Sequence, residues 1–599
     1  MSEIPINIGQ VVEIKLRSRL VKGVIYSQCE KPKFRCEKVE TILNFQFSEK
    51  YLKIIKFISQ YYFCSIGEAT NLFWFDGMED ERKKSQILDN SSLLCGIELS
   101  PEQEEAYNFI ISKPLSLLFG DTGSGKTEIY MKLFEDTIKQ NKSAIFLMPE
   151  ISLTPQMLKR VKEKFGDMVE LWHSKLTKKR RAEILERILS GEVKIVAGAR
   201  SALFLPISDL GLIVVDEEHD DSYKASNRPR YHARDLAIYM GGVLGVKVVL
   251  GSATPSLTSY YKFPHFRLRG TYFKSSKRFI FDKDNSSLNE NIISQIKSSL
   301  DSDKQVIVFV PTRANFKYLN CHECGGFVEC PYCSVGMSLH LDRNALICHY
   351  CNYVEKIPNQ CPECKSSDIR VERIGTAQIV DELSAIFKDC NIAKFDTDEI
   401  TTQKKLNRVI EDFNSKKIDI LVGTQMLSKG HNYLDVDLAV VMGIDNILAM
   451  PDFRSRERAV TLLIQIAGRS GRRGEGRVVI QSRNVEFFNK YLEDYELFLK
   501  DEMNYRKDLY PPFRRVVKIL IKSKDKMKAK DELLKVANCL SQKEGIEIIG
   551  AGEAPISRIS NKYRFNILLR SSSVRMILEA VSLCKSSMCE IDIDPVNFS

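Results

Sequence analysis

Short apolar runs alternate with helical patterns along most of this chain, from about residue 99 onward. Strands that alternate with helices pair in parallel sheets, which the helices then cover. The pattern therefore predicts two α/β domains, each built on a parallel sheet. The runs of the first series lie at residues 115–119, 144–148, 194–197, 212–215 and 246–250, and those of the second at 305–310, 418–422, 438–442 and 477–480.

The flanking segments have other patterns. A short β-rich stretch and an amphipathic helix near residues 49–62 precede the first series, and a mixed α+β tail follows residue 490. Residues 262–300 are polar and predict a linker between the two α/β domains. The 599 residues allow about four folding units. We expect domains at 1–62, 99–270, 271–316 with 366–490, and 491–599, a linker at 63–98 and an insertion at 317–365.

Composition and charge narrow the choice of partners. Hydrophobic residues make up 44% of the chain and charged residues 28%, which is typical of globular rather than disordered proteins. The net charge of +10 favours a polyanionic partner without requiring one. No apolar run is long enough to span a membrane, and the first residues lack the pattern of a signal peptide. We expect a cytoplasmic protein with no membrane partner.

Eight of the 16 cysteines crowd into the insertion as four C-x2-C pairs. Two pairs supply the four thiolates of one tetrahedral Zn²⁺ site, so the array predicts two structural zinc ions. An iron–sulfur cluster is the alternative, and spacing leaves sequential or crossed combination of the pairs open. So short a segment lacks a core of its own, and metal should supply about 10 kcal/mol of its folding free energy. The pairs are Cys321/Cys324, Cys330/Cys333, Cys348/Cys351 and Cys361/Cys364.

A glycine-rich loop follows the first predicted strand and precedes a helical pattern. It matches the phosphate-binding pattern G-x4-G-K-[ST] in the strand–loop–helix setting that the chemistry needs. There the backbone N–H groups bind the phosphates of ATP, Lys126 reaches the β and γ phosphates, and Thr127 binds Mg²⁺. A chance glycine loop is the alternative. The loop consists of Gly120, Asp121, Thr122, Gly123, Ser124, Gly125, Lys126 and Thr127.

Two adjacent carboxylates, Asp216 and Glu217, follow another predicted strand. In that position Asp216 can hold Mg²⁺, and Glu217 can orient the attacking water. Either this motif or the glycine-rich loop alone indicates only nucleotide binding. Together they predict ATP hydrolysis.

Two further motifs suit a motor. Residues 251–254 (GSAT) follow a strand and fit an element that couples two lobes, although a plain strand-to-helix turn would look the same. Arg469 and Arg472 are three residues apart in the second α/β domain, and so on one face if helical. An arginine that reaches the phosphates from a second domain raises the rate by ~10³-fold or more. A solvated basic helix end is the alternative.

These motifs closely resemble those of the PriA family (primosomal protein N′), superfamily 2 replication-restart helicases. The resemblance covers about residues 99–599 and implies two RecA-like lobes, ATP-driven 3′ to 5′ unwinding of DNA at stalled or repaired forks, and initiation of primosome assembly. The segments that carry it are LSPEQ at 99–103, GDTGSGKTEIY at 120–130, PEISLTPQ at 149–156, GARSALF at 198–204, DEEHD at 216–220, GSATPS at 251–256, GTQMLSKGH at 423–431 and QIAGRSGR at 465–472.

The resemblance also implies roles and partners. Gln103 would read adenine, and hydrolysis would rest on Lys126, Asp216, Glu217, Arg469 and Arg472. The outer cysteines, Cys321, Cys324, Cys361 and Cys364, would bind one zinc ion, and the inner four the other. The partners implied are forked and single-stranded DNA, primosome proteins, the replicative helicase loader and single-stranded DNA-binding protein.

An aromatic and basic stretch at residues 222–235 resembles the family's aromatic-rich loop, which links DNA contact to hydrolysis. Here Tyr231 or His232 could stack on a base. The arginines between would then meet phosphates, and a solvated surface loop is the alternative. These arginines are Arg228, Arg230 and Arg234.

The two ends resemble the family less closely. Residues 5–33 resemble part of its N-terminal DNA-binding domain, but its opening strand with a Phe-Asp-Tyr element has no match ahead of Pro5. About 24 residues separate Phe75 from Leu99, too few for the winged helix expected there, so we expect a reduced N-terminal domain that discriminates poorly between 3′ ends.

The tail is basic near its start. Residues 514–530 hold eight basic groups and one acid, and period-2 lysines predict a strand face that contacts DNA or water. Residues 554–570 resemble the family's C-terminal domain, which contacts DNA and partner proteins.

Two rival functions remain. The same motor could be an RNA-dependent ATPase, or the chain could be a primosome scaffold whose motor is dispensable.

Overall fold

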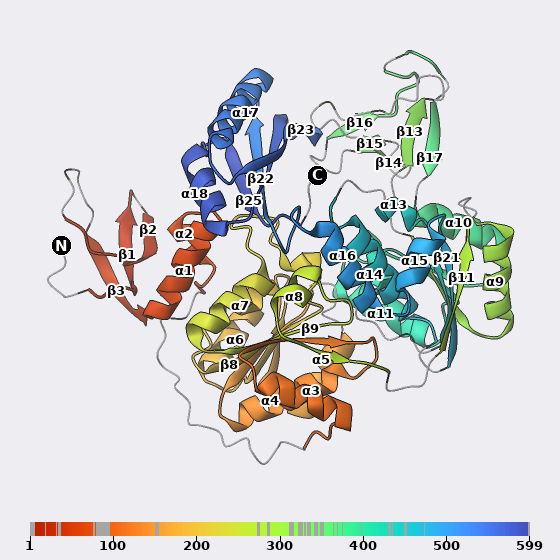
Figure 1. Cartoon of the computed structure of the whole chain (residues 1–599), viewed down its shortest axis with the longest axis horizontal. Coiled ribbons are helices and arrows are strands. Elements are labelled where there is room, and N and C mark those ends of the chain that lie inside the picture. The colour runs from red at the N-terminus through yellow and green to blue at the C-terminus, as the bar shows by residue number, and fades with distance from the viewer. Residues whose placement is uncertain are drawn as a thin grey trace. The chain divides into compact units, whose positions relative to one another are not determined.

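In the computed structural model the chain forms two compact units, residues 1–270 and 271–599, which we describe separately (Figure 1). In the part of the chain that it describes, no helix is long and apolar enough to cross a membrane. The described part is the whole chain apart from residues 1–5, 18, 31–32, 34–37, 76–77, 79–95, 150–154, 272–275, 284–287, 311–316, 322–327, 329–330, 332–336, 341–344, 348–352, 363, 368, 374, 397, 429–432, 434, 449–451, 472–473 and 597–599.

The first unit begins with an N-terminal module, residues 6–75, of three strands and two helices. The strands form an antiparallel sheet in the order β2-β1-β3. The predicted β-rich stretch and the helix near residues 49–62 are both confirmed. The elements are β1 (Gln10–Leu16), β2 (Arg19–Val24), β3 (Val39–Gln46), α1 (Glu49–Tyr61) and α2 (Ile66–Asn71).

A seven-stranded parallel sheet forms the rest of this unit, in the order β10-β4-β9-β8-β5-β7-β6. It confirms the first predicted parallel sheet, which we call lobe 1. Its strands are β4 (Leu115–Gly120), β5 (Ser143–Leu147), β6 (Val169–Trp172), β7 (Ile195–Gly198), β8 (Leu210–Asp216), β9 (Lys247–Ser252) and β10 (His265–Leu268). Its helices are α3 (Pro101–Ile111), α4 (Lys126–Lys139), α5 (Pro155–Phe165), α6 (Lys178–Leu189), α7 (Ala233–Leu244) and α8 (Leu257–Lys262), with 3-10 helices at Gly166–Met168, Arg200–Phe204 and Asp221–Tyr223.

The apolar runs of lobe 1 are continuous because both faces of the sheet are buried. Alternate residues of β5 enter two different cores. Ile145 and Leu147 pack in the core that includes α7, whereas Ala144 and Phe146 pack in the core that includes α4. This two-sided burial holds the carboxyl ends of the strands, and the loops that follow them, in fixed positions.

The second unit contains the other predicted parallel sheet, of six strands in the order β11-β21-β20-β12-β19-β18, which we call lobe 2. Its strands are β11 (Ser276–Asp282), β12 (Gln305–Phe309), β18 (Ile392–Phe395), β19 (Ile420–Gly423), β20 (Val436–Val441) and β21 (Glu475–Gln481). Its helices are α9 (Glu290–Asp301), α10 (Thr376–Ile386), α11 (Gln403–Asn414), α12 (Gln425–Ser428), α13 (Asp445–Leu448), α14 (Ser455–Ala467), α15 (Val485–Tyr491) and α16 (Tyr495–Arg506).

The prediction of a linker at residues 262–300 is wrong for most of that segment. It contains β10, which pairs with β4 in lobe 1, and then β11 and α9, which belong to lobe 2. Both strands lie at sheet edges, where half-exposed polar residues weaken the apolar signal. The chain therefore passes from one lobe to the other between two edge strands.

Two smaller antiparallel sheets complete the second unit. The cysteine-rich insertion has five strands in the order β16-β15-β14-β13-β17, and the C-terminal domain four in the order β23-β24-β22-β25. A Cys539–Cys584 disulfide links the two C-terminal helices. The elements are β13 (Lys317–Cys321), β14 (Ser338–His340), β15 (Ala345–Ile347), β16 (Val354–Lys356), β17 (Ile369–Arg373), β22 (Arg515–Ser523), α17 (Lys526–Ser541), β23 (Glu547–Ile559), β24 (Lys562–Ser571), α18 (Val574–Cys584) and β25 (Cys589–Ile593).

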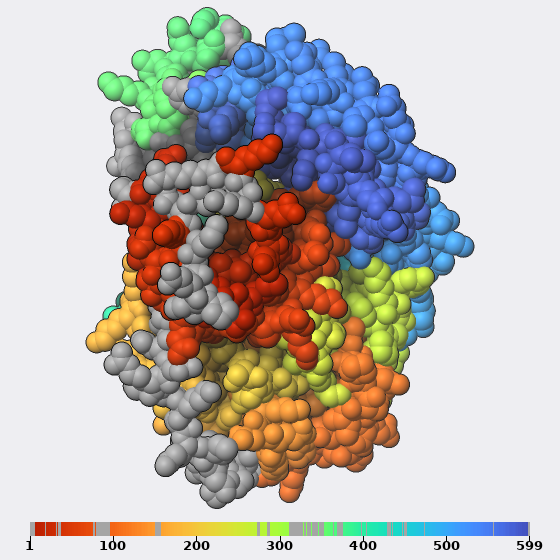
Figure 2. Space-filling model, turned by 90° about the vertical axis from the view of Figure 1, so that its left-hand side faces the viewer, coloured from red at the N-terminus to blue at the C-terminus, as the bar shows by residue number. Residues whose placement is uncertain are grey.

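The N-terminal module and lobe 1 share one hydrophobic core. Phe57 of α1 stacks on Tyr239 of α7 with ring centroids 3.7 Å apart, and Phe73 meets the edge of Phe204. Aromatic pairs of this kind contribute about 0.5–1.5 kcal/mol beyond the burial of their area. Figure 2 shows the module, in red, lying directly on the yellow surface of lobe 1. The module is thus packed against the lobe by side chains.

Candidate nucleotide site and its surroundings

The glycine-rich loop joins the end of β4 to the start of α4. Gly123 and Gly125 have φ angles of +85° and +84°, which side chains other than glycine rarely adopt. A Cβ on Gly125 would lie 2.1 Å from the side-chain nitrogen of Gln103. Glycine at these positions lets the loop backbone wrap closely around a phosphate at the N-terminus of α4.

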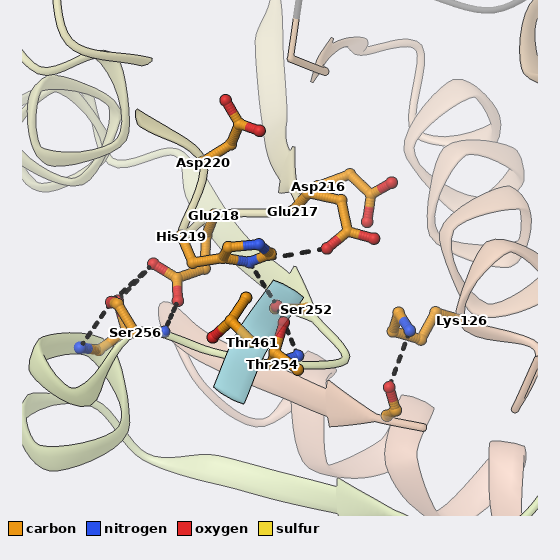
Figure 3. Close-up of polar contacts among 12 residues, drawn as sticks. Lys126, Asp216, Glu217, Glu218, His219, Asp220, Ser252, Thr254, Ser256 and Thr461 are labelled. Atoms are coloured by element: carbon orange, nitrogen blue, oxygen red, sulfur yellow. Dashed lines mark hydrogen bonds and ion pairs between the residues drawn. The ribbon is translucent and has the colours of Figure 1, made fainter. Parts of the chain in front are cut away.

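Lys126 is the first residue of α4. Its Nζ donates hydrogen bonds to the carbonyl oxygens of Gly120, at 2.8 Å, and Asp121, at 3.3 Å. Figure 3 shows this ammonium group beside the loop and Asp216 opposite it. An ammonium on a flexible stem can exchange these carbonyls for phosphate oxygens.

Gln103 and Asp121, two other residues predicted at the nucleotide site, have side chains that contact the protein itself. Gln103 caps α3 by accepting a hydrogen bond from the Ser100 N–H at 2.9 Å, and its own NH₂ lies 3.4 Å from the Gly125 carbonyl. The Asp121 carboxylate accepts the Gly270 N–H at 2.9 Å and pairs with Arg267. Asp121 can therefore offer phosphate only its backbone, and recognition of adenine by Gln103 stays a prediction.

Asp216 ends β8, and Glu217 follows it with a φ of +47°, in the left-handed region. Burial, and then the charge of Glu217, raises the pKa of Asp216 to about 7. Among the described residues, Glu217 Oε2 is buried and accepts no hydrogen bond, although His219 Nδ1 lies 3.6 Å away (Figure 3). Two clustered, partly desolvated carboxylates fit a divalent cation, and Mg²⁺ prefers oxygen ligands. Asp216 and the Thr127 hydroxyl are the residues that suit Mg²⁺, and Glu217 lies next to Asp216.

Glu218 is fully buried and joins the DEEHD segment to the residues after GSAT. Its carboxylate accepts hydrogen bonds from the Ser256 N–H at 2.6 Å, the Ser259 hydroxyl at 2.7 Å and Arg234 Nη1 at 2.9 Å. A second connection is the 2.8 Å hydrogen bond between His219 Nδ1 and Ser252 Oγ (Figure 3). The two motifs are therefore one hydrogen-bonded structure in lobe 1.

The prediction that Tyr231, His232 and Arg234 contact DNA is wrong for this conformation. Their exposed fractions are 6%, 8% and 8%. Tyr231 packs edge-on against Phe204, and burial lowers the pKa of His232 to about 3. Tyr223 and Tyr231 both fill space in the core of the unit. A sequence shows that such residues are aromatic, but not whether they contact DNA or the protein's own core.

The same stretch instead contacts the N-terminal module. Arg228 donates a hydrogen bond to the Phe63 carbonyl at 3.0 Å and lies 3.7 Å from Glu68. The Lys224 ammonium lies over the Tyr62 ring, 5.8 Å from its centroid. The aromatic and basic stretch is thus a joint between the module and lobe 1, and DNA contact by Arg228 and Arg230 stays a prediction.

Models of five protein families match this chain in succession. They are described as a 3'DNA-binding domain at residues 1–74, a DEAD/DEAH box helicase at 100–263, a PriA DNA helicase Cys-rich region domain at 330–356, a helicase conserved C-terminal domain at 352–474 and a primosomal protein N C-terminal domain at 507–596.

Curated relatives match over nearly the whole length. The replication restart protein PriA of Helicobacter pylori is 43% identical, and the match covers 98% of this chain and 96% of the relative. The chain belongs to the PriA family. The PriA of Borreliella burgdorferi is 33% identical over 95% of this chain and 91% of its own, and that of Bacillus subtilis 34% identical over 80% and 63%. As a member of this family, the chain is a superfamily 2 helicase.

The PriA cysteine-rich region supports zinc in the insertion. Of the predicted ligands, the structure describes the side chains of Cys361 and Cys364. The Cys361 carbonyl accepts a hydrogen bond from the Lys365 N–H at 3.0 Å, and the Cys361 N–H donates one to the Ser366 carbonyl at 2.8 Å. The Cys361/Cys364 pair therefore lies on a tight turn, which suits two thiolates on one Zn²⁺. Cys321 ends β13, whereas Cys324, Cys330, Cys333, Cys348 and Cys351 lie outside the described residues.

The two predicted PriA arginines follow α14, which ends at Ala467. Arg469 is buried with 7% of its surface exposed, and Arg472 lies outside the described residues. Because α14 ends before Arg469, the argument that the two arginines share a face of this helix does not apply. A buried cluster fixes α14 to α16, with Arg506 between Glu457 at 2.7 Å and Glu502 at 2.9 Å.

The basic stretch at the start of the PriA C-terminal domain is not one strand face. Lys518 is buried, and β22 ends at Ser523, so the lysines from Lys526 onward lie on α17. Acidic side chains pair with three of the seven other basic groups, which weakens the prediction of DNA contact. These pairs are Arg515–Asp594 at 2.9 Å, Lys522–Glu590 at 2.8 Å and Lys526–Glu553 at 2.8 Å.

In the PriA 3'DNA-binding domain, the β1–β2 hairpin presents basic and apolar side chains together. Lys15 and Arg19 are exposed beside Leu16 and Leu20, which are 59% and 57% exposed. Basic groups with apolar neighbours suit contact with both the phosphates and the bases of a strand.

Sequence reasoning missed Tyr130 and Tyr223, two buried tyrosines; Tyr130 contacts the Asp216 carboxylate, whereas Tyr223 contacts only its main chain. The Tyr130 hydroxyl donates to Asp216 Oδ1 at 3.1 Å, and the Tyr223 hydroxyl reaches the Asp216 carbonyl at 2.6 Å. The signal for Tyr130 was its position four residues after Lys126, on the same face of the helix. Tyr223 had no comparable signal, because it ends a short 3-10 helix, Asp221–Tyr223, that is too brief to show a periodic pattern.

Proposed function

We propose that this chain is an ATP-dependent DNA helicase that unwinds in the 3′ to 5′ direction at stalled or repaired replication forks and begins primosome assembly there. Membership of the PriA family and its helicase domains support replication restart. One observation supports hydrolysis most directly. The Lys126 loop and the half-buried Asp216–Glu217 pair come together at the carboxyl ends of β4 and β8, two strands of one parallel sheet that are separated by β9.

We assign the following roles and partners. Backbone N–H groups of the loop and Lys126 bind the phosphates, and Asp216 with Thr127 holds Mg²⁺, which neutralises phosphate charge. Glu217 orients the attacking water. Arg469 and Arg472 supply positive charge from lobe 2, and the eight cysteines hold two Zn²⁺. Replicative helicase loader, other primosome proteins and single-stranded DNA-binding protein are the partners.

Replacement of Lys126 by alanine tests the function. The variant should lose ATP hydrolysis and unwinding and keep fork binding within several-fold, because the Lys126 ammonium hydrogen-bonds to carbonyl groups of the phosphate loop. Lys132→Ala is the matched control, since Lys132 lies on the same helix but pairs with Glu135 and Asp136, each at 3.2 Å. ATPase above a tenth of wild type in Lys126→Ala would refute the assignment of the loop.

The direction of unwinding and the preference for DNA over RNA need separate measurements. Partial duplexes with a 3′ or a 5′ single-stranded tail distinguish the directions, and we expect unwinding only from the 3′ tail. Single-stranded DNA should stimulate ATPase more than RNA of the same sequence. Equal stimulation by RNA would favour the RNA-dependent ATPase instead.

A further inference from the structure

Tyr130 is a buried polar residue that ATP hydrolysis, as described above, does not use. It lies on α4, one helical turn after Lys126, and only 1% of its surface is exposed. Its hydroxyl lies 3.1 Å from Asp216 Oδ1. A phenol donates and a carboxylate accepts, so the hydrogen bond points from α4 to the end of β8.

The same hydroxyl also faces the first residue of the GSAT segment. Gly251 pairs with Asp216 in the parallel register of β8 and β9. A Cβ at Gly251 would lie 1.6 Å from the Tyr130 hydroxyl oxygen and 2.8 Å from the ring carbon that bears it. Tyr130 therefore occupies the space that any side chain at position 251 would need, and it contacts two motifs, at Asp216 and at Gly251, from the helix that follows the phosphate loop.

An orienting hydrogen bond matters for a carboxylate that binds a cation. A carboxylate can rotate about its last bond, and a partner on one oxygen fixes the direction of the other. Removal of such a partner commonly costs 10–100-fold in metal affinity. Tyr223 cannot replace Tyr130 here, because its hydroxyl reaches main-chain carbonyls, of Asp216 at 2.6 Å and of Leu147 at 3.0 Å.

We propose that Tyr130 is a positioning residue whose hydroxyl orients the Asp216 carboxylate toward the Mg²⁺ of Mg-ATP, and that the same hydroxyl is the main reason for glycine at position 251. This rests on the proposed ATP hydrolysis and adds a specific requirement to it. The phosphate loop and the metal carboxylate are thereby connected through one side chain of α4.

Tyr130→Phe removes the hydroxyl and keeps the ring. Binding of a fluorescent ATP analogue is titrated with Mg²⁺ and repeated in EDTA. The Mg²⁺ midpoint should rise about tenfold or more, whereas binding in EDTA should stay within twofold of wild type, because the phosphate loop is unchanged. A shift in midpoint of less than threefold would overturn the proposal.

Tyr223→Phe is the matched control, because it removes an equally buried hydroxyl that leaves the carboxylate alone. Its Mg²⁺ midpoint should stay within twofold of wild type. An equal shift in both variants would show a general loss of packing and would overturn the role of Tyr130.

A second pair of variants tests the contact with Gly251. Gly251→Ala should raise the Mg²⁺ midpoint strongly, and Gly251→Ala/Tyr130→Phe should recover part of it, because the closest clash is with the hydroxyl oxygen. A double variant no better than Gly251→Ala would count against the contact. If wild-type protein binds no Mg-ATP, the proposed function fails, whereas normal wild type with an unshifted Tyr130→Phe contradicts only the inference.

Discussion

The buried Arg234–Glu218 pair allows a quantitative prediction for lobe 1. Arg234→Met removes the guanidinium and keeps an aliphatic side chain of similar length. Glu218 has no exposed surface, so water cannot replace the lost charge. The carboxylate would keep its hydrogen bonds from Ser256 and Ser259 but remain uncompensated. Breaking a buried pair in this way costs about 3–5 kcal/mol.

The measurement can be confined to the first unit of the intact protein. Both tryptophans, Trp74 and Trp172, lie in that unit, so intrinsic fluorescence reports its unfolding. A loss of about 3–5 kcal/mol in a unit of this size should lower the thermal midpoint by about 10 °C. Lys159→Met, in an exposed pair with Glu163, should leave the midpoint unchanged.

The double variant Glu218→Gln/Arg234→Met decides whether charge is the cause. Glutamine keeps an oxygen for the Ser256 N–H and leaves no buried charge, so the double variant should be more stable than Arg234→Met alone. A midpoint for Arg234→Met within about 2 °C of wild type, or no recovery in the double variant, would refute the reasoning.

Three further outcomes follow from other parts of the molecule. Metal analysis should give two zinc ions per chain, and Cys361→Ser should lose about one of them; one zinc in wild type, or iron, would contradict the two-site prediction. Burial, then the charge of Glu68, raises the pKa of Cys64 to about 11, so at pH 8 iodoacetamide should alkylate it about a hundredfold more slowly than exposed Cys29. Rates within tenfold would contradict this. Forks with a 3′ hydroxyl or a 3′ phosphate on the leading strand should bind with affinities within about threefold, since phosphate contacts do not read a strand end; a tenfold preference would mean that a pocket reads the hydroxyl.

The sequence predicts the centres of both parallel sheets and misses their edges. Each predicted run overlaps a strand of the structure, but β6, β10, β11 and β18 were not predicted, and these are the four edge strands. A central strand is buried on both faces and reads as a continuous apolar run. The edge strand β6 carries the charged Glu170, and β10 is mostly half-buried, so neither stands out.

The predicted nucleotide site could be read from local motifs, because the phosphate loop is contiguous in the chain. Contacts between charged residues that lie far apart in the sequence could not be predicted. Arg234 and Lys518 look like surface cations in the sequence, yet both are buried. Arg234 pairs with Glu218, 16 residues away. A sequence records the charge of a side chain but not its partner, and burial of a charge depends on that partner.

The stacking of Phe57 on Tyr239 has a mechanical consequence. A DNA-binding module on a flexible tether would search a volume set by the length of its linker. Here the module is held at one position and in one orientation on α7. A strand gripped by the module would therefore approach lobe 1 along a fixed direction. Tension on that strand would be transmitted to the parallel sheet directly through the packed side chains, because no flexible linker has to extend first.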